Sequence, residues 1–348
     1  MARDRRLIAR TALLLAVLVA AAALLRPLPR EPAVTGGERA QGSDVALYQA
    51  IAARVAGGEA YVPTAMAEQR ARNFPVRPGP AVRPPALAQL MAYGEAPARI
   101  LFFGLLAATL VVWARQGAAA GLRPILIALL LLSIGLPVAM HALGPGLWFH
   151  ESWAGLLVAL SLGAWRPGAW RASLAAGLAA MLLREFALGF GAAMLAMALA
   201  ERRRGEAAGW VVAIAIAGVA LGWHWSLVAA SALPGDPASP GWSGLLGPGF
   251  ALDSLRQMGL LAAAPLALAA PLLALALAGW SMAGAVGRRV LIAQAGWLLM
   301  LATLARPDNF YWAALALPLS LGGLLFLPRL LAAARGGKDG AMGESHAP

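Results

Sequence analysis

The chain has 348 residues, of which 60% are hydrophobic and 13% are charged. Because a soluble domain carries about 45–50% apolar and about 25% charged residues, this composition is typical of a polytopic membrane protein. Cysteine is absent, which excludes a disulfide framework, a thiolate nucleophile and a cysteine-based metal site. The net charge of +12 does not indicate nucleic-acid binding, because the arginines lie in short clusters between apolar segments, as in the cytoplasmic loops of membrane proteins.

The N-terminal segment is basic and then apolar, an order that signal peptides and first membrane helices share. Residues 7–25 form an apolar stretch longer than the ~7–15 residues usual in a signal peptide, and the sequence after it is Arg-Pro-Leu-Pro-Arg rather than a run of small residues. We expect an uncleaved first span, with a cleaved signal peptide as the alternative. Arg3, Arg5 and Arg6 then place the N-terminus in the cytoplasm.

A long polar interval, residues 28–97, separates the first apolar segment from the second, and we expect it to be an outer loop. Residues 45–55 repeat apolar side chains at the spacing of one helix face, which predicts an amphipathic helix on the membrane surface. Ser43 or Asp44 could cap its first turn. From Tyr61 onward several prolines predict an irregular segment, and residues 86–93 predict a short helix before the second span.

The remaining apolar segments predict an all-α membrane domain over residues 1–333, with about ten transmembrane helices. Each expected inner loop carries arginine, which places both termini in the cytoplasm. Residues 234–257 are rich in proline and glycine and predict an outer loop, whereas residues 334–348 predict a disordered cytoplasmic tail. The expected spans are residues 7–25, 100–114, 124–143, 153–165, 172–183, 186–200, 207–233, 258–280, 290–305 and 311–327.

The pair Arg184-Glu185 interrupts the apolar stretch of residues 172–200. A single helix over this range, at ~1.5 Å per residue, would be longer than the ~30 Å hydrocarbon core. We therefore expect two short helices that meet at a charged break open to an outer cavity, with one long helix as the alternative. Charged residues within apolar segments are candidates for function, and Arg184 could pair with a lipid phosphate or with an internal carboxylate.

Two positions on the expected outer side could carry chemistry. Asp44 could be a general base at the interface, where a lipid-linked substrate presents its head group, and a helix N-cap is the structural alternative. His150 and Glu151 could orient an acceptor or bind phosphate, or they could form an interfacial polar pair beside aromatic residues. A metal site is not expected, because no second His or Cys stands at ligand spacing.

Near the start of the last expected span, Arg306, Asp308 and Asn309 precede three aromatic residues. These charged, amide and aromatic groups could line a sugar or phosphate pocket, whereas an aromatic girdle would explain the aromatic residues only. The sequence contains no glycine-rich phosphate loop and no serine nucleophile elbow. This disfavours an ATP-driven or soluble nucleotide-sugar enzyme.

Five short stretches carry a resemblance to a known family: Ser43-Asp44 to Tyr48, Gly57-Gly58-Glu59-Ala60-Tyr61, Arg83-Pro84-Pro85-Ala86, Glu151 and Arg184-Glu185. Together with the order of the segments, they resemble the integral-membrane glycosyltransferases of the C-type fold. The resemblance is closest to glycosyltransferase family 87, whose members depend on polyprenol-phosphate-mannose, and it covers most of the chain in layout. Arg83 is a departure, since the family often has Tyr before Pro-Pro.

The resemblance implies inverting transfer of a mannose-like hexose or pentose from a polyprenyl-phosphate donor to a hydroxyl of a glycan, lipid or protein acceptor. The reaction would take place on the outer face of a bacterial inner membrane. The resemblance makes Asp44 the catalytic base, and Arg184 and Arg306 the ligands of the donor phosphate. The lipid-linked sugar is the co-substrate, and the need for a divalent metal stays open. The implied donor and acceptor pocket contains Tyr48, Tyr61, His150, Glu151, Glu185, Asp308 and Asn309.

The main alternative is a non-enzymatic membrane protein: a lipid or solute transporter, a flippase or an assembly scaffold. Transporters often show two related halves and broken helices near mid-membrane. The sequence shows no internal repeat, and its polar residues concentrate on the expected outer side. This distribution favours the transferase.

Overall fold

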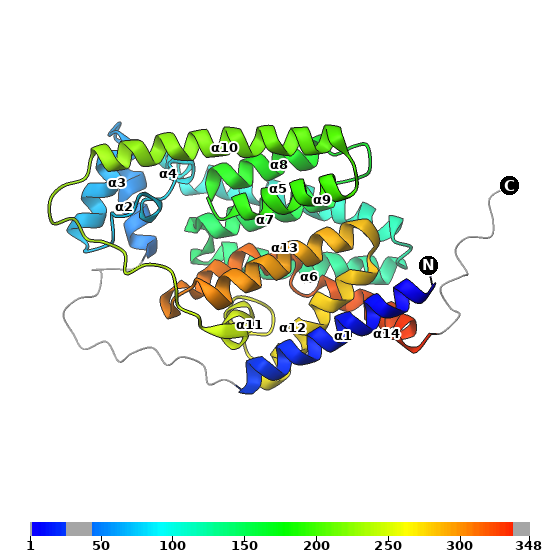
Figure 1. Ribbon diagram of the computed structural model, residues 1–348. Coiled ribbons are helices and arrows are strands. Elements are labelled where there is room, and N and C mark those ends of the chain that lie inside the picture. The colour runs from blue at the N-terminus through cyan, green and yellow to red at the C-terminus, as the bar shows by residue number, and fades with distance from the viewer. Residues whose placement is uncertain (1, 26–43, 337–348) are drawn as a thin grey trace. The chain divides into compact units, whose positions relative to one another are not determined.

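The computed structural model describes residues 2–25 and 44–336 (Figure 1). In these residues the only β-type contact is an isolated bridge between Arg77 and Ala238, and the named elements are helices, which confirms the all-α fold class. The chain forms two compact units. Unit 1 contains the described residues of Met1–Pro29, Leu110–Pro137 and Ser243–Pro348, and unit 2 contains those of Arg30–Thr109 and Val138–Trp242.

Unit 2 is built around one long helix, α10 (Arg204–Ala230). Helices α8 and α9 pack against α10 and α7, and α3 packs near one end of α10 together with α2 and α4 (Figure 1). Apolar side chains of α2 and α3 meet Val228 of α10 in a shared core. The other elements are α2 (Asp44–Ala56), α3 (Tyr61–Ala71), η1 (Gly79–Ala81), α4 (Ala86–Ala92), the first part of α5 (Glu95–Ala119), the end of α6 (Pro124–Leu143), η2 (Pro145–Trp148), α7 (His150–Ala164), α8 (Arg171–Leu183) and α9 (Ala187–Ala200).

Unit 1 places α1 (Ala2–Leu25) against α11, α12 and α14. Alanines of α1 and α12, together with Leu330, form its small-residue core. The backbones of Gly279 and Gly323 lie so close that neither position has room for a Cβ atom. The other elements are α11 (Gly247–Met258), α12 (Leu266–Gly279), η3 (Trp280–Met282), α13 (Gly284–Thr303), η4 (Pro307–Leu315), η5 (Leu317–Leu319), η6 (Gly322–Phe326), α14 (Leu327–Arg335) and the remaining parts of α5 and α6.

The chain is a multi-pass membrane protein with several apolar helices. In its described residues six helices are long and apolar enough to cross a membrane, by length and composition. These six are Asp4–Leu25, Glu95–Ala119, Pro124–Leu143, Arg204–Ala230, Gly284–Thr303 and Leu317–Arg335. Arg171–Leu183, Ala187–Ala200 and Leu266–Met282 are shorter apolar helices, so the expected count of ten spans is not confirmed.

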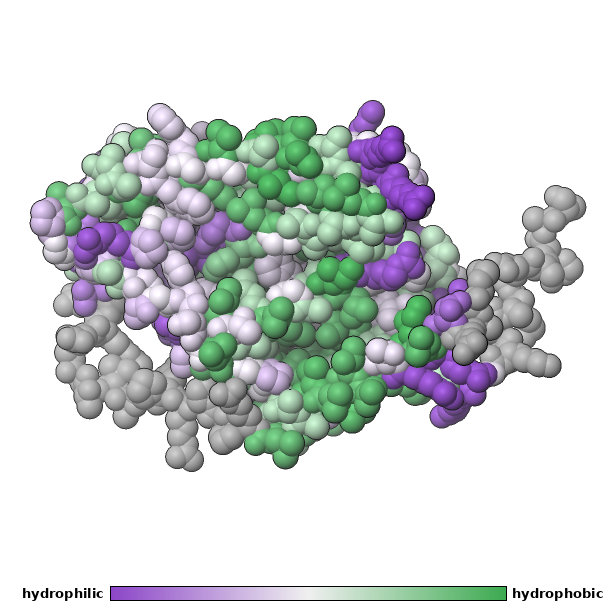
Figure 2. All heavy atoms as spheres, in the orientation of Figure 1, coloured by the Kyte–Doolittle hydropathy of each residue, from purple (hydrophilic) through white to green (hydrophobic). Residues whose placement is uncertain are grey.

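The surface of α10 has the character of a membrane helix. Its exposed side carries large apolar side chains, among them Val211, Ile216, Val219 and Leu227. Figure 2 shows hydrophobic side chains along the visible face of α10, and hydrophilic side chains gathered where α9 leads into α10. An apolar surface with arginines at one end is typical of a membrane span whose charged end lies outside the hydrocarbon core.

Three predicted features of unit 2 are confirmed. The amphipathic stretch forms α2 and buries Leu47, Ile51 and Ala52, while Ser43 lies outside the described residues. The short helix before the second span is α4. Arg184 is extended, with φ −146° and ψ 116°, so α8 and α9 are separate helices and the alternative of one long helix is excluded. The expected tail lies outside the described residues beyond Gly336.

Two segments expected to be irregular contain helices. The prediction of irregular chain from Tyr61 was wrong for Tyr61–Ala71, which forms α3, although it holds for most of the chain between α3 and α4. Pro63 is the third residue of α3, where the N–H group that proline lacks would have had no intrahelical partner. The predicted loop at residues 234–257 likewise ends in α11, which has a proline at its start.

Two predicted spans of unit 1 also differ from the structure. The span expected at residues 258–280 begins as a helix only at Leu266, directly after Pro265. Residues 311–327 were expected to form a regular helix, yet they form short 3₁₀ segments before α14. Pro318 and the Gly322-Gly323 pair explain the second difference, because proline removes a backbone donor and glycine weakens helix propagation.

Candidate functional site

The residues selected from the sequence fall into two sets. Unit 2 contains Asp44, Tyr48, Tyr61, His150, Glu151, Arg184 and Glu185. Unit 1 contains Arg306, Asp308 and Asn309. All residues of each set lie within a single unit.

In unit 2 the charged break between α8 and α9 forms a buried ion cluster. Arg184 Nε donates to Glu151 Oε1 at 2.8 Å, and the two side chains are 0% and 1% exposed. Arg184 also pairs with Glu185, and its guanidinium carbon lies 3.9 Å from the centre of the Phe186 ring. Because one guanidinium holds two carboxylates, the charge that interrupts the apolar segment is satisfied inside the unit.

Arg83 joins this cluster to the neighbouring tyrosines. Its Nη1 atom lies 3.9 Å from Glu185 Oε1, its side chain hydrogen-bonds Tyr48, and its carbonyl oxygen accepts the Tyr61 hydroxyl at 2.8 Å. From the sequence alone, Arg83 was noted only as a departure from the family motif. The signal that could have found it is a basic residue within a proline-rich outer segment, next to two candidate tyrosines.

A small, partly open pocket lies beside the cluster, and we call it the His150 pocket. It lies between α2, α3, α4 and the turn that precedes α7. His150 meets the Tyr48 ring edge-on, with 5.5 Å between the ring centroids. The residues that line it are Tyr48, Ile51, Tyr61, Leu87, Ala88, Met91, Trp148 and His150.

His150 is only 3% exposed, and neither of its ring nitrogens makes a hydrogen bond of standard geometry to the described residues. Burial, together with the positive charges of Arg83 and Arg184, lowers the pKa of His150 to about 3, against opposing effects of Glu185 and the Pro84 backbone. The imidazole is therefore neutral at physiological pH. A neutral imidazole carries one N–H donor and one acceptor nitrogen.

The two tyrosines are also neutral at physiological pH. Burial raises the pKa of Tyr48 to about 12, with Arg83 opposing this and the carboxylates of Asp44 and Glu151 adding to it. Burial likewise raises the pKa of Tyr61. Both phenols therefore stay protonated and act as hydrogen-bond donors.

Asp44 is the first residue of α2 and precedes Tyr48 by one helical turn. Residues four apart share a helix face, so Asp44 lies on the Tyr48 side of α2. Its negative charge at the helix N-terminus is favourable in itself, because it complements the helix dipole. The position of Asp44 agrees with a structural role at the start of α2. It agrees equally with a functional carboxylate beside Tyr48 and Arg83.

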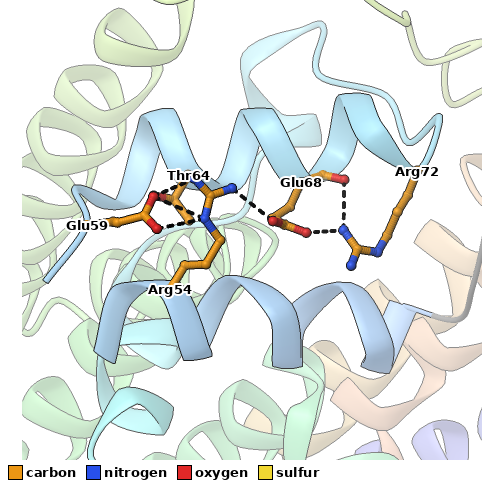
Figure 3. A network of polar contacts seen from close by, with 5 residues as sticks. All are labelled: Arg54, Glu59, Thr64, Glu68 and Arg72. Atoms are coloured by element: carbon orange, nitrogen blue, oxygen red, sulfur yellow. Dashed lines mark hydrogen bonds and ion pairs between the residues drawn. The ribbon is translucent and has the colours of Figure 1, made fainter. Parts of the chain in front are cut away.

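A polar network fixes α2 against α3 (Figure 3). Arg54 of α2 donates to Glu59 at 2.9 and 3.0 Å and to Glu68 of α3 at 2.9 Å. Thr64 donates to Glu59, and Arg72 pairs with Glu68. Arg54 lowers the pKa of both carboxyl groups, so they are ionised at neutral pH. The network holds the helix that carries Tyr48 beside the helix that carries Tyr61.

The candidate residues of unit 1 form a local turn. Arg306 donates through Nε and Nη2 to the two oxygens of Asp308, at 3.1 and 3.0 Å. The backbone N–H of Arg306 donates to Asn309 Oδ1 at 3.2 Å, and Asn309 is buried. These contacts cap the start of η4 and neutralise the Arg306 charge. This arrangement explains the motif structurally, and a phosphate-binding role for Arg306 stays a prediction.

Within the described ranges, no three His, Cys, Asp or Glu side chains gather closely enough to hold a metal ion. The polar groups of the unit 2 site are instead arginines, carboxylates, phenols and a neutral imidazole. Such a set can stabilise an anion, accept a proton and hydrogen-bond hydroxyl groups. Comparison with protein-family models, with curated protein sequences and with solved structures found no match to this chain.

Proposed function

We propose that this protein is a glycosyltransferase of the bacterial inner membrane, which moves a sugar from a polyprenyl-phosphate donor to an acceptor hydroxyl with inversion. The observation that carries the proposal is the convergence, within unit 2, of residues from distant parts of the sequence. Asp44 and Tyr48 of α2 lie near Arg83, His150 and the ion cluster of the α8–α9 break. These were the residues selected from the sequence, except for Arg83.

The proposed reaction is a single displacement. Asp44 takes the proton of the acceptor hydroxyl while the acceptor oxygen attacks the anomeric carbon. The bond from that carbon to the phosphate oxygen breaks, and the polyprenyl phosphate leaves with the electron pair. Negative charge grows on the phosphate as the bond breaks, and a fixed guanidinium beside it stabilises that charge.

Arg83 is the better candidate for the phosphate ligand within unit 2. Arg184 is fully buried and already holds Glu151 and Glu185, so a phosphate would have to displace a carboxylate to reach it. The Arg83 side chain is 14% exposed and hydrogen-bonds Tyr48, whose pKa Asp44 also influences. We therefore assign Arg184 the part of a positioning residue, which fixes Glu151 and Glu185 behind the site.

The proposed orientation has both termini in the cytoplasm and the active site on the outer face. Arg202, Arg203 and Arg204 lie where α10 begins and Arg123 follows α5, and arginines beside membrane spans mark cytoplasmic loops. The site residues come from the segments expected on the opposite side. An outer site suits a lipid-linked donor, because such a donor supplies the sugar without a nucleotide sugar on that side of the membrane.

The test is transfer of labelled sugar from polyprenyl-phosphate donors by the purified protein in nanodiscs. Asp44→Asn is expected to lower turnover by about 10²–10⁴-fold, the usual contribution of a general base. Glu95→Gln is the matched control, because Glu95 is also an acidic residue in the first turn of a helix and lies in a surface pair with Arg99. It should keep wild-type turnover.

The alternatives give different results. A transporter or scaffold would neither transfer sugar from the polyprenyl-phosphate donors nor hydrolyse them. Binding of these donors without transfer or hydrolysis would overturn the proposal. Transfer that is equally fast in Asp44→Asn would keep the enzyme but remove Asp44 as its base. If the protein is a flippase, it should move the same donors from one leaflet of a vesicle membrane to the other.

A further inference from the structure

We infer that unit 2 binds the head groups of anionic phospholipids, such as phosphatidylglycerol, where the turn between α7 and α8 meets the turn between α9 and α10. We call this place the arginine corner and define it by its four exposed arginines, Arg166, Arg171, Arg202 and Arg204. Three observations carry the inference: the two turns are fastened together, the four arginines have no acidic partner in the described part of the chain, and exposed apolar helix surface adjoins them.

Buried tryptophan contacts fasten the two turns to each other. Trp165, which follows α7, donates through Nε1 to Glu206 Oε1 of α10 at 2.8 Å, and both side chains are buried. The guanidinium carbon of Arg203 lies 4.8 Å from the centre of the Trp165 ring. The ring of Trp170 packs against α10 so closely that Gly209 has no room for a Cβ atom. The arginines that follow the two tryptophans are therefore held near those that flank Arg203.

The acidic residues of the two turns are already paired with Arg203. Its Nε atom lies 3.0 Å from Glu201 Oε2, and its Nη1 atom lies 3.6 Å from Glu206 Oε2. In the described ranges, no ion pair joins an acidic group to any of the four arginines of the corner. Figure 2 shows hydrophilic side chains gathered at this end of α10. Positive charge without an acidic partner attracts anions, and a guanidinium group matches the oxygens of a phosphate.

Exposed apolar side chains lie on both helices that lead away from the corner. Leu199, in the last turn of α9, and Val211 and Val212, two turns into α10, are each more than half exposed. A phospholipid can use both surfaces, since its phosphate faces the arginines while its acyl chains lie along the helices. Arginine suits this position, because its stem packs on apolar surface while its head group stays at the interface. A free phosphate would use the arginines only, so the geometry favours a lipid.

The arginine corner is remote from the site of the proposed reaction. At ~1.5 Å per residue, α10 places Arg204 about 36 Å from Val228. Val228 packs against α2 and α3, which carry Tyr48 and Tyr61. Since this separation exceeds the ~30 Å hydrocarbon core, the two ends of α10 lie at opposite membrane surfaces. The phospholipid at the corner is therefore distinct from a polyprenyl-phosphate donor, and the inference does not depend on the proposed function.

The experiment is native mass spectrometry of the full chain in detergent, titrated with phosphatidylglycerol or with phosphatidylcholine of the same acyl chains. The wild-type protein should bind the first phosphatidylglycerol more tightly. Arg166→Gln and Arg204→Gln should each weaken this binding about fivefold, the usual effect of one arginine near an anionic lipid, and leave phosphatidylcholine unchanged. The preference should shrink as the ionic strength rises from about 0.1 M to about 1 M.

Two controls separate the charge of the corner from other causes. Arg99→Gln removes the same charge from a surface pair with Glu95 and should bind phosphatidylglycerol like the wild type. The double variant Arg166→Lys with Arg204→Lys keeps both charges and should retain most of the binding, even if a glutamine variant fails to fold.

Glycerophosphoglycerol, the head group without acyl chains, distinguishes a lipid from a soluble anion. At the concentration of the lipid it should not displace phosphatidylglycerol, and displacement would overturn the assignment to a lipid. Equal binding of phosphatidylglycerol by the wild type and both glutamine variants would overturn the inference. So would equal affinities for the two phospholipids, or a loss in the lysine variant as large as the loss in the glutamine variants.

Discussion

Arg184 Nε lies 2.8 Å from Glu151 Oε1, and both side chains are inaccessible to solvent. Arg184 is the extended residue between α8 and α9, whereas Glu151 lies in the first turn of α7. The pair therefore ties the break between two short helices to the start of a third. A buried pair of this kind is sensitive to the loss of either partner, because the remaining charge stays in the interior.

We expect Glu151→Gln to lower the free energy of unfolding by about 3 kcal/mol, at the lower end for breaking a buried pair because Glu185 still faces Arg184. Denaturant titration in detergent measures this change. Removing both charges with Glu151→Leu and Arg184→Met should recover most of the loss. A double variant that is less stable than Glu151→Gln would contradict the account of an uncompensated buried charge.

The α2–α3 network predicts unequal effects for its two glutamates. The Glu68 side chain is 14% exposed and bridges Arg54 and Arg72, whereas Glu59 is 46% exposed. Exposed ion pairs contribute little to stability. Glu68→Gln should therefore lower Tm more than Glu59→Gln, which should change it by about 2 °C or less. Equal Tm values for the two variants would show that the network does not fix α2 against α3.

The pairing of Arg70 with Asp236 predicts a pH dependence at the end of α10. Arg70 donates to Asp236 at 2.6 and 2.9 Å, and this contact, with the Leu233 N–H, lowers the pKa of Asp236 to about 2. The carboxylate contributes stability above its ordinary pKa of about 4, and this contribution is lost as the pH falls from about 4 toward 2. The Tm difference between wild type and Asp236→Asn should be constant above pH 5 and shrink below pH 4. A difference that stays the same down to pH 2 would rule out this linkage.

The close approach of Gly279 and Gly323 in unit 1 predicts that alanine is not tolerated at either position. A Cβ at Gly279 would meet the carbonyl of Gly323, and a Cβ at Gly323 would meet that of Ala276. Each variant should lose about 1–3 kcal/mol of stability, as is usual for overpacking. Gly296→Ala is the control, since a Cβ there meets nothing and alanine favours the helix. Thermal unfolding of the three variants in one detergent is the comparison, and equal Tm values would refute the close contact.

Local signals in the sequence predicted the features that depend on neighbouring residues. The spacing of Leu47, Ile51 and Ala52 predicted a helix, because one face of α2 must be apolar to pack. The break at Arg184 was predicted because charged residues interrupt the apolar stretch there and one helix over residues 172–200 would be longer than the hydrocarbon core. Proline was a less reliable signal for irregular chain. In α3 and α11 a proline lies in the first turn of the helix, where it does not interrupt helical structure.

For the candidate site, the sequence identified residue types rather than partners. Asp44, His150, Glu151 and Arg184 were selected because polar groups beside apolar segments are unusual. Arg83 was missed, because its significance comes from contacts with Tyr48, Tyr61 and Glu185. Arg306 was selected for its charge, yet within its unit that charge is paired with Asp308 two residues away.

The amino-acid sequence was enough to predict an all-helical, multi-pass membrane protein with an amphipathic helix and a charged helix break. Composition and periodicity suffice for this, since apolar length and side-chain spacing act locally. The tertiary structure was needed to show that Glu151 holds Arg184 and that His150 is buried beside Tyr48 in an aromatic pocket. Such contacts join residues far apart in the chain, and helix packing alone sets which of them meet.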